Sequence, residues 1–236
     1  MEFSGKTAMI TGAGRGIGEE IARMFAAQGA SVAIIARTAS DAERVASEIR
    51  SAGGKAMAAV CDVSVEKDVI RTVSAIEEAF GSVDILVNNA AVFRGGYLDE
   101  LSLEDWHIPF RVTMDGTFLC CKHVLKGMKA RHWGKIINIA SAAISHPFKT
   151  YGAYAAAKSG LLGFSTTLQE EVRGDGINVN TVVLGLTNTA DVRQRATLPP
   201  EEMLQPADVA NAVTFLASDK ARGFKGAALE LFGDHV

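Results

Sequence analysis

The stretch "TAMITGAGRGIG", residues 7–18, joins a short apolar run to a turn that is rich in glycine. Glycine lets the backbone turn tightly and lets a phosphate approach it closely. A helix that begins in such a turn also presents free N–H groups and the positive end of its dipole to an anion. A turn without any ligand would have the same composition. The position of the stretch, at the first strand-to-helix turn of an alternating chain, favours a dinucleotide-binding turn.

The rest of the chain alternates in the same way. Seven apolar runs are expected as strands: 7–11, 31–36, 56–61, 84–88, 135–140, 177–183 and 227–232. They are continuously apolar, which is typical of strands covered on both faces. Amphipathic stretches expected as helices lie at about 16–28, 41–52, 66–80, 103–130, 152–173 and 206–218. This order predicts an α/β fold: one doubly wound Rossmann-type domain over residues 1–236, with a mostly parallel seven-stranded sheet and helices on both faces.

Charge and cysteine content exclude several function classes. The 236 residues carry a formal net charge of −3, so neither nucleic-acid binding nor binding to an anionic membrane surface is expected. No apolar run approaches the roughly 18 residues of a membrane span, and the first residues lack a signal-peptide core. The three cysteines, Cys61, Cys120 and Cys121, form no C-x-x-C pair. We therefore expect no disulfide framework, no metal site and a cytoplasmic location.

The glycine spacing also fits T-G-x-x-x-G-x-G, with Thr11, Gly12, Gly16 and Gly18. In this the chain resembles the short-chain dehydrogenase/reductase family, in its 3-oxoacyl reductase-like branch. The resemblance covers nearly the whole chain. It implies an oxidoreductase that transfers a hydride between a nicotinamide cofactor and a ketone or secondary alcohol.

A second family motif, Y-x-x-x-K with a serine thirteen residues before the tyrosine, fits at one place. Tyr154 has Lys158 at +4 and Ser141 at −13, whereas neither Tyr97 nor Tyr151 is followed by a lysine at +4. Residues i and i+4 share one face of a helix, and Ser141 follows a predicted strand at the edge where parallel sheets bind ligands. A surface helix that happens to carry a tyrosine and a lysine is the alternative. Three matches at fixed spacing favour a catalytic group.

These residue types suit proton transfer to a carbonyl. A free tyrosine has a pKa of about 10, and a nearby ammonium favours its phenolate. We expect Tyr154 to protonate the carbonyl oxygen during reduction and to remove the proton in reverse. Ser141 is expected to hold the substrate oxygen. Lys158 is expected to lower the pKa of Tyr154 and, as the resemblance implies, to bond the nicotinamide ribose.

The resemblance also implies the cofactor-binding positions. They are Gly12, Arg15, Gly16, Ile17, Gly18, Arg37, Asp62, Val63, Asn89, Ala90, Tyr154, Lys158, Gly185 and Thr189. Asp62 would hold the adenine ring, or it could cap the helix that begins near Glu66. Thr189 would contact the nicotinamide or the phosphates, or it could be a loop residue without a ligand.

The cofactor is expected to be NADP(H), with NAD(H) possible. Relatives that prefer NAD usually place an acid at the end of the second strand, where this chain has Ala36 followed by Arg37. Arg15 lies in the glycine turn. Two guanidinium groups can hold a 2′-phosphate with charge-assisted hydrogen bonds.

Several positions depart from the family pattern. The fourth catalytic member of the family is an asparagine that holds a water for proton relay, and the segment "WHIPFRVTMDGTF" (106–118) has Thr113 there. A threonine hydroxyl is shorter and cannot present both amide groups. Pro109 is expected to kink or delay the helix. Ala91 replaces a glycine and Leu184 a proline, and the segment after Thr189 looks short for a lid.

The substrate is not specified by these motifs. Loops near 91–102, 141–151 and 184–200 are expected to surround a small-molecule carbonyl or alcohol. Four residues could recognise a polar or anionic substrate or could simply be solvated: Arg94, His146, Lys149 and Tyr151. Two alternatives stay open: a cofactor-binding protein with weak or no catalysis, and a non-redox reaction such as dehydration. Family members usually pair through two long helices, here 103–130 and 152–173, so a homodimer or homotetramer is expected.

Overall fold

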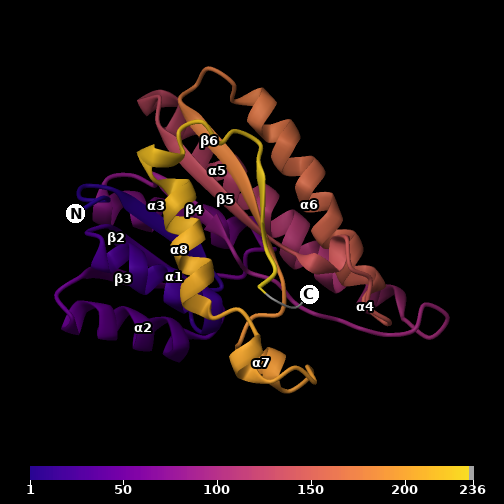
Figure 1. The fold of residues 1–236 in the computed structure, drawn as a ribbon. Helices are drawn as coiled ribbons and strands as arrows, with labels where there is room; N and C mark the ends of the chain where they lie inside the picture. Colours follow the sequence, from indigo (N-terminus) through magenta and orange to yellow (C-terminus); the bar gives the residue numbers. More distant parts are fainter. Residues whose placement is uncertain (234–236) are drawn as a thin grey trace.

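The computed structural model describes residues 1–233 and contains the predicted parallel sheet (Figure 1). Its strand order is β3-β2-β1-β4-β5-β6-β7, and every neighbouring pair in it is parallel. The strands are β1 (Thr7–Thr11), β2 (Ser31–Ala36), β3 (Lys55–Val60), β4 (Ile85–Asn88), β5 (Gly134–Ser141), β6 (Ile177–Leu184) and β7 (Ala228–Leu231). Each lies within one or two residues of its predicted bounds. Residues 234–236 of the predicted domain lie outside the described part.

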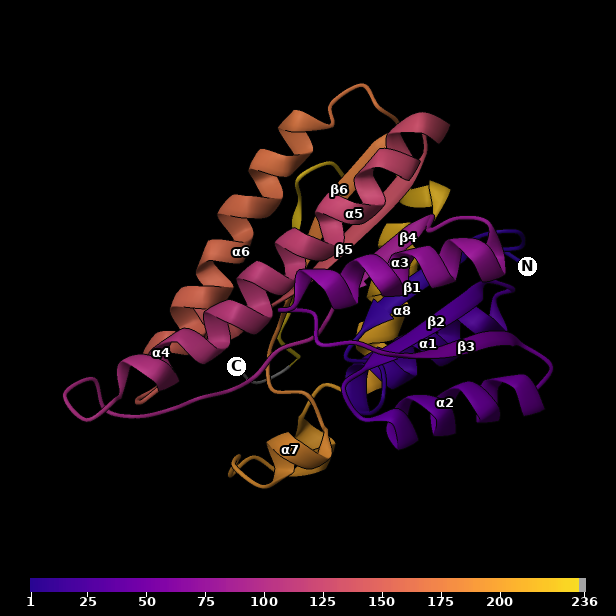
Figure 2. The same cartoon turned by 180° about the vertical axis from the view of Figure 1, so that it is seen from behind.

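Helices cover both faces of the sheet. They are α1 (Gly16–Ala27), α2 (Ala39–Ser51), α3 (Glu66–Phe80), α4 (Leu103–Phe110), α5 (Gly116–Arg131), α6 (Gly152–Glu171), α7 (Ala190–Arg193) and α8 (Pro206–Ala217), with a π-helical turn η1 (Arg111–Asp115) and 3₁₀ turns η2 (Ala142–Ile144), η3 (Pro200–Glu202) and η4 (Asp219–Ala221). Helices α1, α2 and α8 pack on one face, and α3, α5 and α6 on the other (Figures 1 and 2). The doubly wound Rossmann-type fold is confirmed.

Two apolar cores, one on each face, hold the layers together. The central strands β1, β4 and β6 are buried along their whole length, as their continuous apolar sequence predicts. On one face Ile21 and Phe25 of α1 pack with α8 and the sheet, and on the other Val73 and Ile76 of α3 pack with α5. Each such side chain stabilises the fold by about 1.5–3 kcal/mol. This rigid frame fixes the carboxyl ends of the strands, where the strand order reverses between β1 and β4.

The long helix predicted for 103–130 is interrupted in a specific way. It begins at Leu103, so Pro109 does not delay it; Pro109 lies buried inside α4. Proline has no N–H to donate, which weakens the helical hydrogen-bond pattern at this point. The next turn, η1, has π-helical geometry, and α5 continues from Gly116. Such π turns often mark functional positions, and this one contains Thr113.

The segment after β6 leaves the carboxyl edge of the sheet and carries α7, which projects beyond the strands (Figure 1). Its base is closed by a bridge between Thr187 and Leu204. Within residues 1–233 we find no helix with both the length and the apolar content to cross a membrane.

Candidate active site

The glycine turn has the backbone geometry that its sequence suggested. Gly12 and Gly16 have φ values of +66° and +60°, which side chains disfavour. A Cβ added to Gly18 would lie 2.5 Å from the carbonyl oxygen of Gly12. The turn therefore needs glycine for its conformation and for the close packing of α1. It leaves a concave backbone surface at the N-terminus of α1, which suits a pyrophosphate.

Thr11 and Asn89 join the glycine turn to the end of β4. The backbone N–H groups of Asn89 and Ala90 both donate to the hydroxyl of Thr11, at 3.0 Å each. The side-chain amide of Asn89 donates to the carbonyls of Thr11, at 2.9 Å, and Gly12, at 3.2 Å. Asn89 thus positions the turn through hydrogen bonds, a role that the sequence motif did not reveal.

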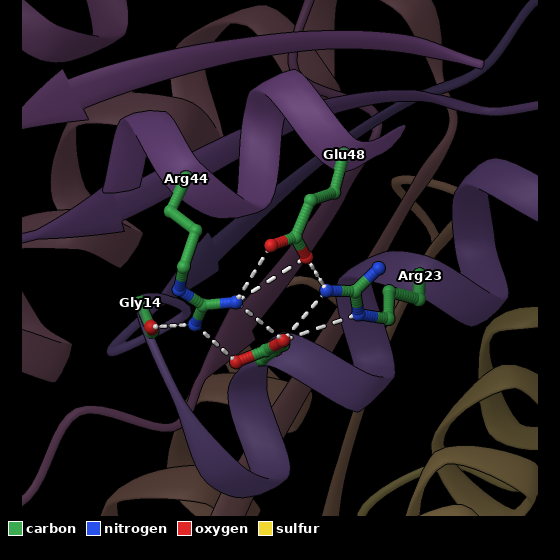
Figure 3. A network of polar contacts seen from close by, with 5 residues as sticks. Gly14, Arg23, Arg44 and Glu48 are labelled. Atoms are coloured by element: carbon green, nitrogen blue, oxygen red, sulfur yellow. Dashed lines mark hydrogen bonds and ion pairs between the residues drawn. The ribbon is translucent and has the colours of Figure 1, made fainter. Parts of the chain in front are cut away.

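An ion-pair network between α1 and α2 also holds the glycine turn (Figure 3). Arg44 of α2 donates to the carbonyl of Gly14 at 3.0 Å and pairs with Glu19 of α1 at 2.7 Å. Arg23 pairs with Glu19 and with Glu48. Two arginines face two glutamates, so the charges of this cluster compensate each other. The network fixes α1 against α2 and leaves Arg44 engaged with protein partners.

A groove of about 480 Å³ runs along the carboxyl edge of the sheet past the glycine turn. Most of the predicted cofactor-binding residues line it: Gly12, Arg15, Gly16, Ile17, Arg37, Asp62, Val63, Asn89, Ala90, Tyr154 and Thr189. Lys158 and Gly185 line a smaller cavity next to it instead, and Gly18 lies buried under the turn. The groove's length along the edge and its glycine cradle fit a dinucleotide.

Asp62 and Thr189 have local partners as well as a place in the groove. The carboxylate of Asp62 accepts from the N–H and hydroxyl of Ser64, at 3.0 and 2.6 Å. It does not cap the next helix, α3, whose N-cap residue is Val65. Thr189 caps α7 by accepting from the N–H of Val192 at 3.4 Å.

The smaller cavity, of about 180 Å³, brings Ser141, Tyr154 and Lys158 together. Ser141 ends β5, and its hydroxyl oxygen accepts from the N–H of Ala143 at 3.3 Å. The same hydroxyl forms a side-chain hydrogen bond with Tyr154. Tyr154 lies in the first turn of α6, with the Nζ of Lys158 5.8 Å from its ring centre. The Nζ of Lys158 donates to the carbonyl of Ile139. A serine, a tyrosine and a lysine thus converge on one cavity beside the groove.

Burial dominates the acid–base properties of this group. It raises the pKa of Tyr154, while the hydroxyl of Ser141 and the charge of Arg195 act in the opposite direction. It lowers the pKa of Lys158 to about 8. In the protein alone, the pKa of Tyr154 is set by desolvation rather than by Lys158, and the expected effect of Lys158 together with an oxidised nicotinamide stays a prediction. Tyr154 is a neutral phenol at pH 7, the form that donates a proton.

Thr113, the residue at the family's asparagine position, is buried in η1, which packs against α6. Within residues 1–233 its hydroxyl is the one buried side-chain oxygen or nitrogen without a hydrogen-bond partner. An unsatisfied buried hydroxyl costs about 1–3 kcal/mol and calls for an explanation in a folded protein.

Of the four residues expected near the substrate, the structure places only Tyr151 in the cavity wall. The Nε of Arg94 lies 3.6 Å from the Oδ1 of Asp105, and the ring of His146 meets that of Phe232 edge-to-face, with ring centres 5.3 Å apart. Lys149 is exposed and lines neither cavity.

Sequence reasoning did not single out several residues that line these cavities. Thr38 and Asp41 lie in the groove near Arg37, and Phe93 and Arg195, which belong to the predicted substrate loops, line both cavities. Thr38 and Asp41 follow Arg37 within four residues at the start of a helix, which was a usable signal. Nothing in the local sequence marks Phe93 or Arg195, because their loops meet only in the folded chain.

Comparison with known proteins agrees with this geometry. The sequence profile described as short chain dehydrogenase matches residues 6–198. The chain belongs to the short-chain dehydrogenase family. As predicted, it is an oxidoreductase of the class acting on CH–OH or C=O groups.

Two curated members of the short-chain dehydrogenase family match over nearly their full length. D-threitol dehydrogenase of Mycolicibacterium smegmatis is 35% identical, with 99% of this chain and 94% of that protein aligned. The 3-oxoacyl-[acyl-carrier-protein] reductase FabG of Escherichia coli is 36% identical, with 99% and 98% aligned. A solved structure, 7 alpha-hydroxysteroid dehydrogenase complexed with NADH and 7-oxo glycochenodeoxycholic acid, superposes with a TM-score of 0.94 at 30% identity, covering 100% of this chain and 96% of the other.

Proposed function

We propose that the protein is an NADP(H)-dependent carbonyl reductase that interconverts a ketone and a secondary alcohol, with Ser141, Tyr154 and Lys158 as its catalytic residues. The observation that carries this proposal is their convergence on one cavity beside a groove suited to a dinucleotide. A nicotinamide cofactor, when bound in that groove, supplies or accepts the hydride.

Tyr154 acts as the general acid for reduction. Its neutral phenol donates a proton to the carbonyl oxygen, so that an alcohol forms rather than an alkoxide. The hydroxyl of Ser141, which is hydrogen-bonded to Tyr154 in the protein alone, donates to the same oxygen when substrate binds and stabilises the negative charge that develops on it. Because burial keeps Tyr154 protonated, the protein alone is prepared for reduction. Oxidation requires the phenolate and so benefits from a higher pH.

Lys158 is the cationic residue of α6 and lies one turn after Tyr154. Its pKa of about 8 keeps most of it charged at pH 7, although it is buried and held by the carbonyl of Ile139. A charged group at this depth favours the phenolate form of Tyr154 once it has lost its proton. We infer that Lys158 assists the return of a proton to Tyr154 between turnovers.

The proposed preference for NADP(H) rests on Arg37. Its guanidinium lines the groove, and among residues 1–233 it has no hydrogen-bond or ion-pair partner. Thr38 starts α2 without using its side chain as a cap, so its hydroxyl is available beside Arg37. Arg15, in contrast, pairs with Asp191 at 2.8 Å. Asp41 lines the same groove, and its negative charge repels a phosphate. The preference for NADP(H) therefore depends on how far Arg37 outweighs Asp41.

The related proteins named above act on threitol, on 3-oxoacyl groups carried by acyl carrier protein and on a steroid, so they do not define one substrate. The test is a panel of ketones with NADPH, and of alcohols with NADP⁺ in reverse, followed by absorbance of the reduced cofactor. We expect turnover of at least one ketone. Tight NADPH binding without turnover of any carbonyl would favour the alternative of a non-catalytic cofactor-binding protein.

We further propose that the protein forms a homodimer or homotetramer. Phe118 of α5 is 48% exposed, and on α6 a Cβ at Gly163 would meet no atom within 4 Å. An exposed aromatic ring on α5 and an open, small-residue position on α6 suit close helix packing between subunits.

A further inference from the structure

We propose that Arg195 selects substrates that carry an anionic group, a carboxylate or a phosphate, in addition to the reacting carbonyl. This inference rests on the proposed carbonyl reductase function and names the substrate class of the same site. It depends on the position of Arg195, on the way its guanidinium is held and on the charges that line the cavity.

Arg195 lies where the two cavities meet. It follows the one-turn helix α7, is exposed to solvent and lines both the groove and the smaller cavity. Its guanidinium carbon lies 4.4 Å from the centre of the Phe93 ring. Phe93 in turn contacts Tyr151 and Tyr154, with ring centres 4.4 and 5.7 Å apart. Arg195 is therefore connected to the proposed proton donor through one aromatic side chain.

A hydrogen bond and the ring of Phe93 hold the guanidinium of Arg195, but no described carboxylate forms an ion pair with it. Its Nε donates to the carbonyl of Asp191 at 3.1 Å, and no ion pair involves it in the described part of the chain. Within residues 1–233 no hydrogen bond involves its two terminal nitrogens, which can therefore donate together to a carboxylate or phosphate. A guanidinium already held by a hydrogen bond and an aromatic ring loses less side-chain entropy when it binds.

Among residues 1–233, Arg195 is the one charged residue on the lining of the smaller cavity that is exposed to solvent. The described lining contains no aspartate, glutamate or histidine, and its other cation, Lys158, is buried and bonded to Ile139. Apolar and aromatic side chains make up most of the wall, including Phe93, Phe148 and Tyr151. This arrangement fits a flat or apolar body that carries the carbonyl at one end and an anion at the other. The charge of Arg195 also favours the phenolate of Tyr154.

The test compares matched ketones and matched variants. The ketones are 4-acetylbenzoate and its methyl ester, together with hydroxyacetone phosphate and hydroxyacetone. The variants are Arg195→Gln, which removes the charge, and Arg193→Gln as control. Arg193 lies in the same segment, donates to Asn188 at 2.7 Å and lines neither cavity. The readouts are the ratio of kcat/KM for each anionic ketone to that of its neutral partner, the Kd for NADPH, and calorimetric binding of the anion to the protein with NADP⁺.

We expect the wild type and Arg193→Gln to prefer one anionic ketone, and Arg195→Gln to lose that preference roughly 10- to 100-fold, with an unchanged Kd for NADPH. A preference for 4-acetylbenzoate over its methyl ester identifies the anion as a carboxylate, and a preference for hydroxyacetone phosphate over hydroxyacetone identifies it as a phosphate. The proposal is overturned if the wild type has no preference, or if Arg195→Gln retains it. It is also overturned if Arg195→Gln weakens NADPH binding and lowers kcat/KM equally for the anionic and the neutral ketone of a pair, because Arg195 would then hold the cofactor. If no ketone turns over but Arg195 still determines anion binding, the proposed reaction fails while this inference stands.

Discussion

The proposed cofactor preference rests on two side chains of opposite charge near the start of α2, Arg37 and Asp41. If Arg37 holds the 2′-phosphate, Arg37→Gln should weaken NADPH binding by roughly 10-fold or more and change NADH binding little. Asp41→Asn should strengthen NADPH binding, because it removes a like charge from the same groove. Fluorescence titration with both reduced cofactors measures each effect. Tighter binding of NADH than of NADPH to the wild type would contradict the proposed preference.

Burial of Lys158 has a cost that depends on pH. Its pKa is 10.5 in a solvated chain and about 8 in the folded protein, so the unfolded chain binds more protons between these values. The charged ammonium therefore destabilises the fold by ~3 kcal/mol below pH 8, and the penalty fades as the pH rises from about 8 to 10.5. Lys158→Met should raise the free energy of unfolding at pH 7, raise it less at pH 10, and abolish turnover.

Denaturant unfolding at the two pH values checks this prediction. Lys126→Met, at an exposed position on α5, serves as control and should change the unfolding free energy little at either pH. An equal effect of Lys158→Met at pH 7 and pH 10 would show that the ammonium is not desolvated in the folded state.

Residue roles were predictable where the residues lie at a fixed spacing in one helix or at the end of a predicted strand. Tyr154 and Lys158 share one helix, and Ser141 ends a strand that the apolar pattern located. Arg195 and Phe93 lie in the predicted substrate loops, but their contact was not predicted because they are 102 residues apart and meet only through the fold. The raised pKa of Tyr154 was also missed, since desolvation depends on all the surrounding side chains.

The π turn η1 contains Thr113, the residue that the sequence motif places at the family's asparagine position. Thr113 has a buried hydroxyl without a partner there, so Thr113→Val should stabilise the protein by ~1 kcal/mol if the hydroxyl has no role. If the hydroxyl contributes to proton relay, the same change should lower kcat. Thermal unfolding and steady-state kinetics on the one variant separate these effects. A loss of stability without a loss of rate would show that Thr113 serves packing alone.

Thr113→Asn restores the side chain of the family pattern and tests the relay directly. Relay and general-acid effects typically amount to factors of 10²–10⁴. We expect only a modest gain, because Pro109 and the π turn alter the helix where the asparagine would lie. The parent should then be slow on generic ketones. Turnover by the parent at ordinary rates of roughly 10 per second would show that Thr113 is a sufficient replacement.

The order of the strands and main helices was predictable, but the short helix α7 and the division of the helix predicted for 103–130 were not. The seven strands and the main helices lie close to their expected bounds because continuous apolar runs and amphipathic stretches mark them directly. The split of the predicted helix 103–130 was expected only as a kink or delay at Pro109. Proline indicates a weakened helix, but the π geometry that follows depends on how η1 packs against α6.

Assembly is a property of the whole molecule. An exposed ring at Phe118 predicts that light scattering at micromolar concentration will show a dimer or tetramer. Phe118→Asp should lower the mass of the assembly measured in solution, because it places a charge in the proposed interface. Ile70→Asp, at an exposed apolar residue of α3 outside that interface, is the control. A monomeric wild type would refute the proposed association.

The central claim is that this fold carries out carbonyl reduction through Tyr154. The most direct measurement is NADPH oxidation, followed by absorbance, with an accepted ketone and three proteins: wild type, Tyr154→Phe and Tyr151→Phe. Both tyrosines line the cavity, but only Tyr154 has Lys158 one turn away. We predict that Tyr154→Phe loses at least about 100-fold in kcat while it still binds NADPH, and that Tyr151→Phe changes mainly KM. Equal losses in the two variants, or full activity in Tyr154→Phe, would contradict the account.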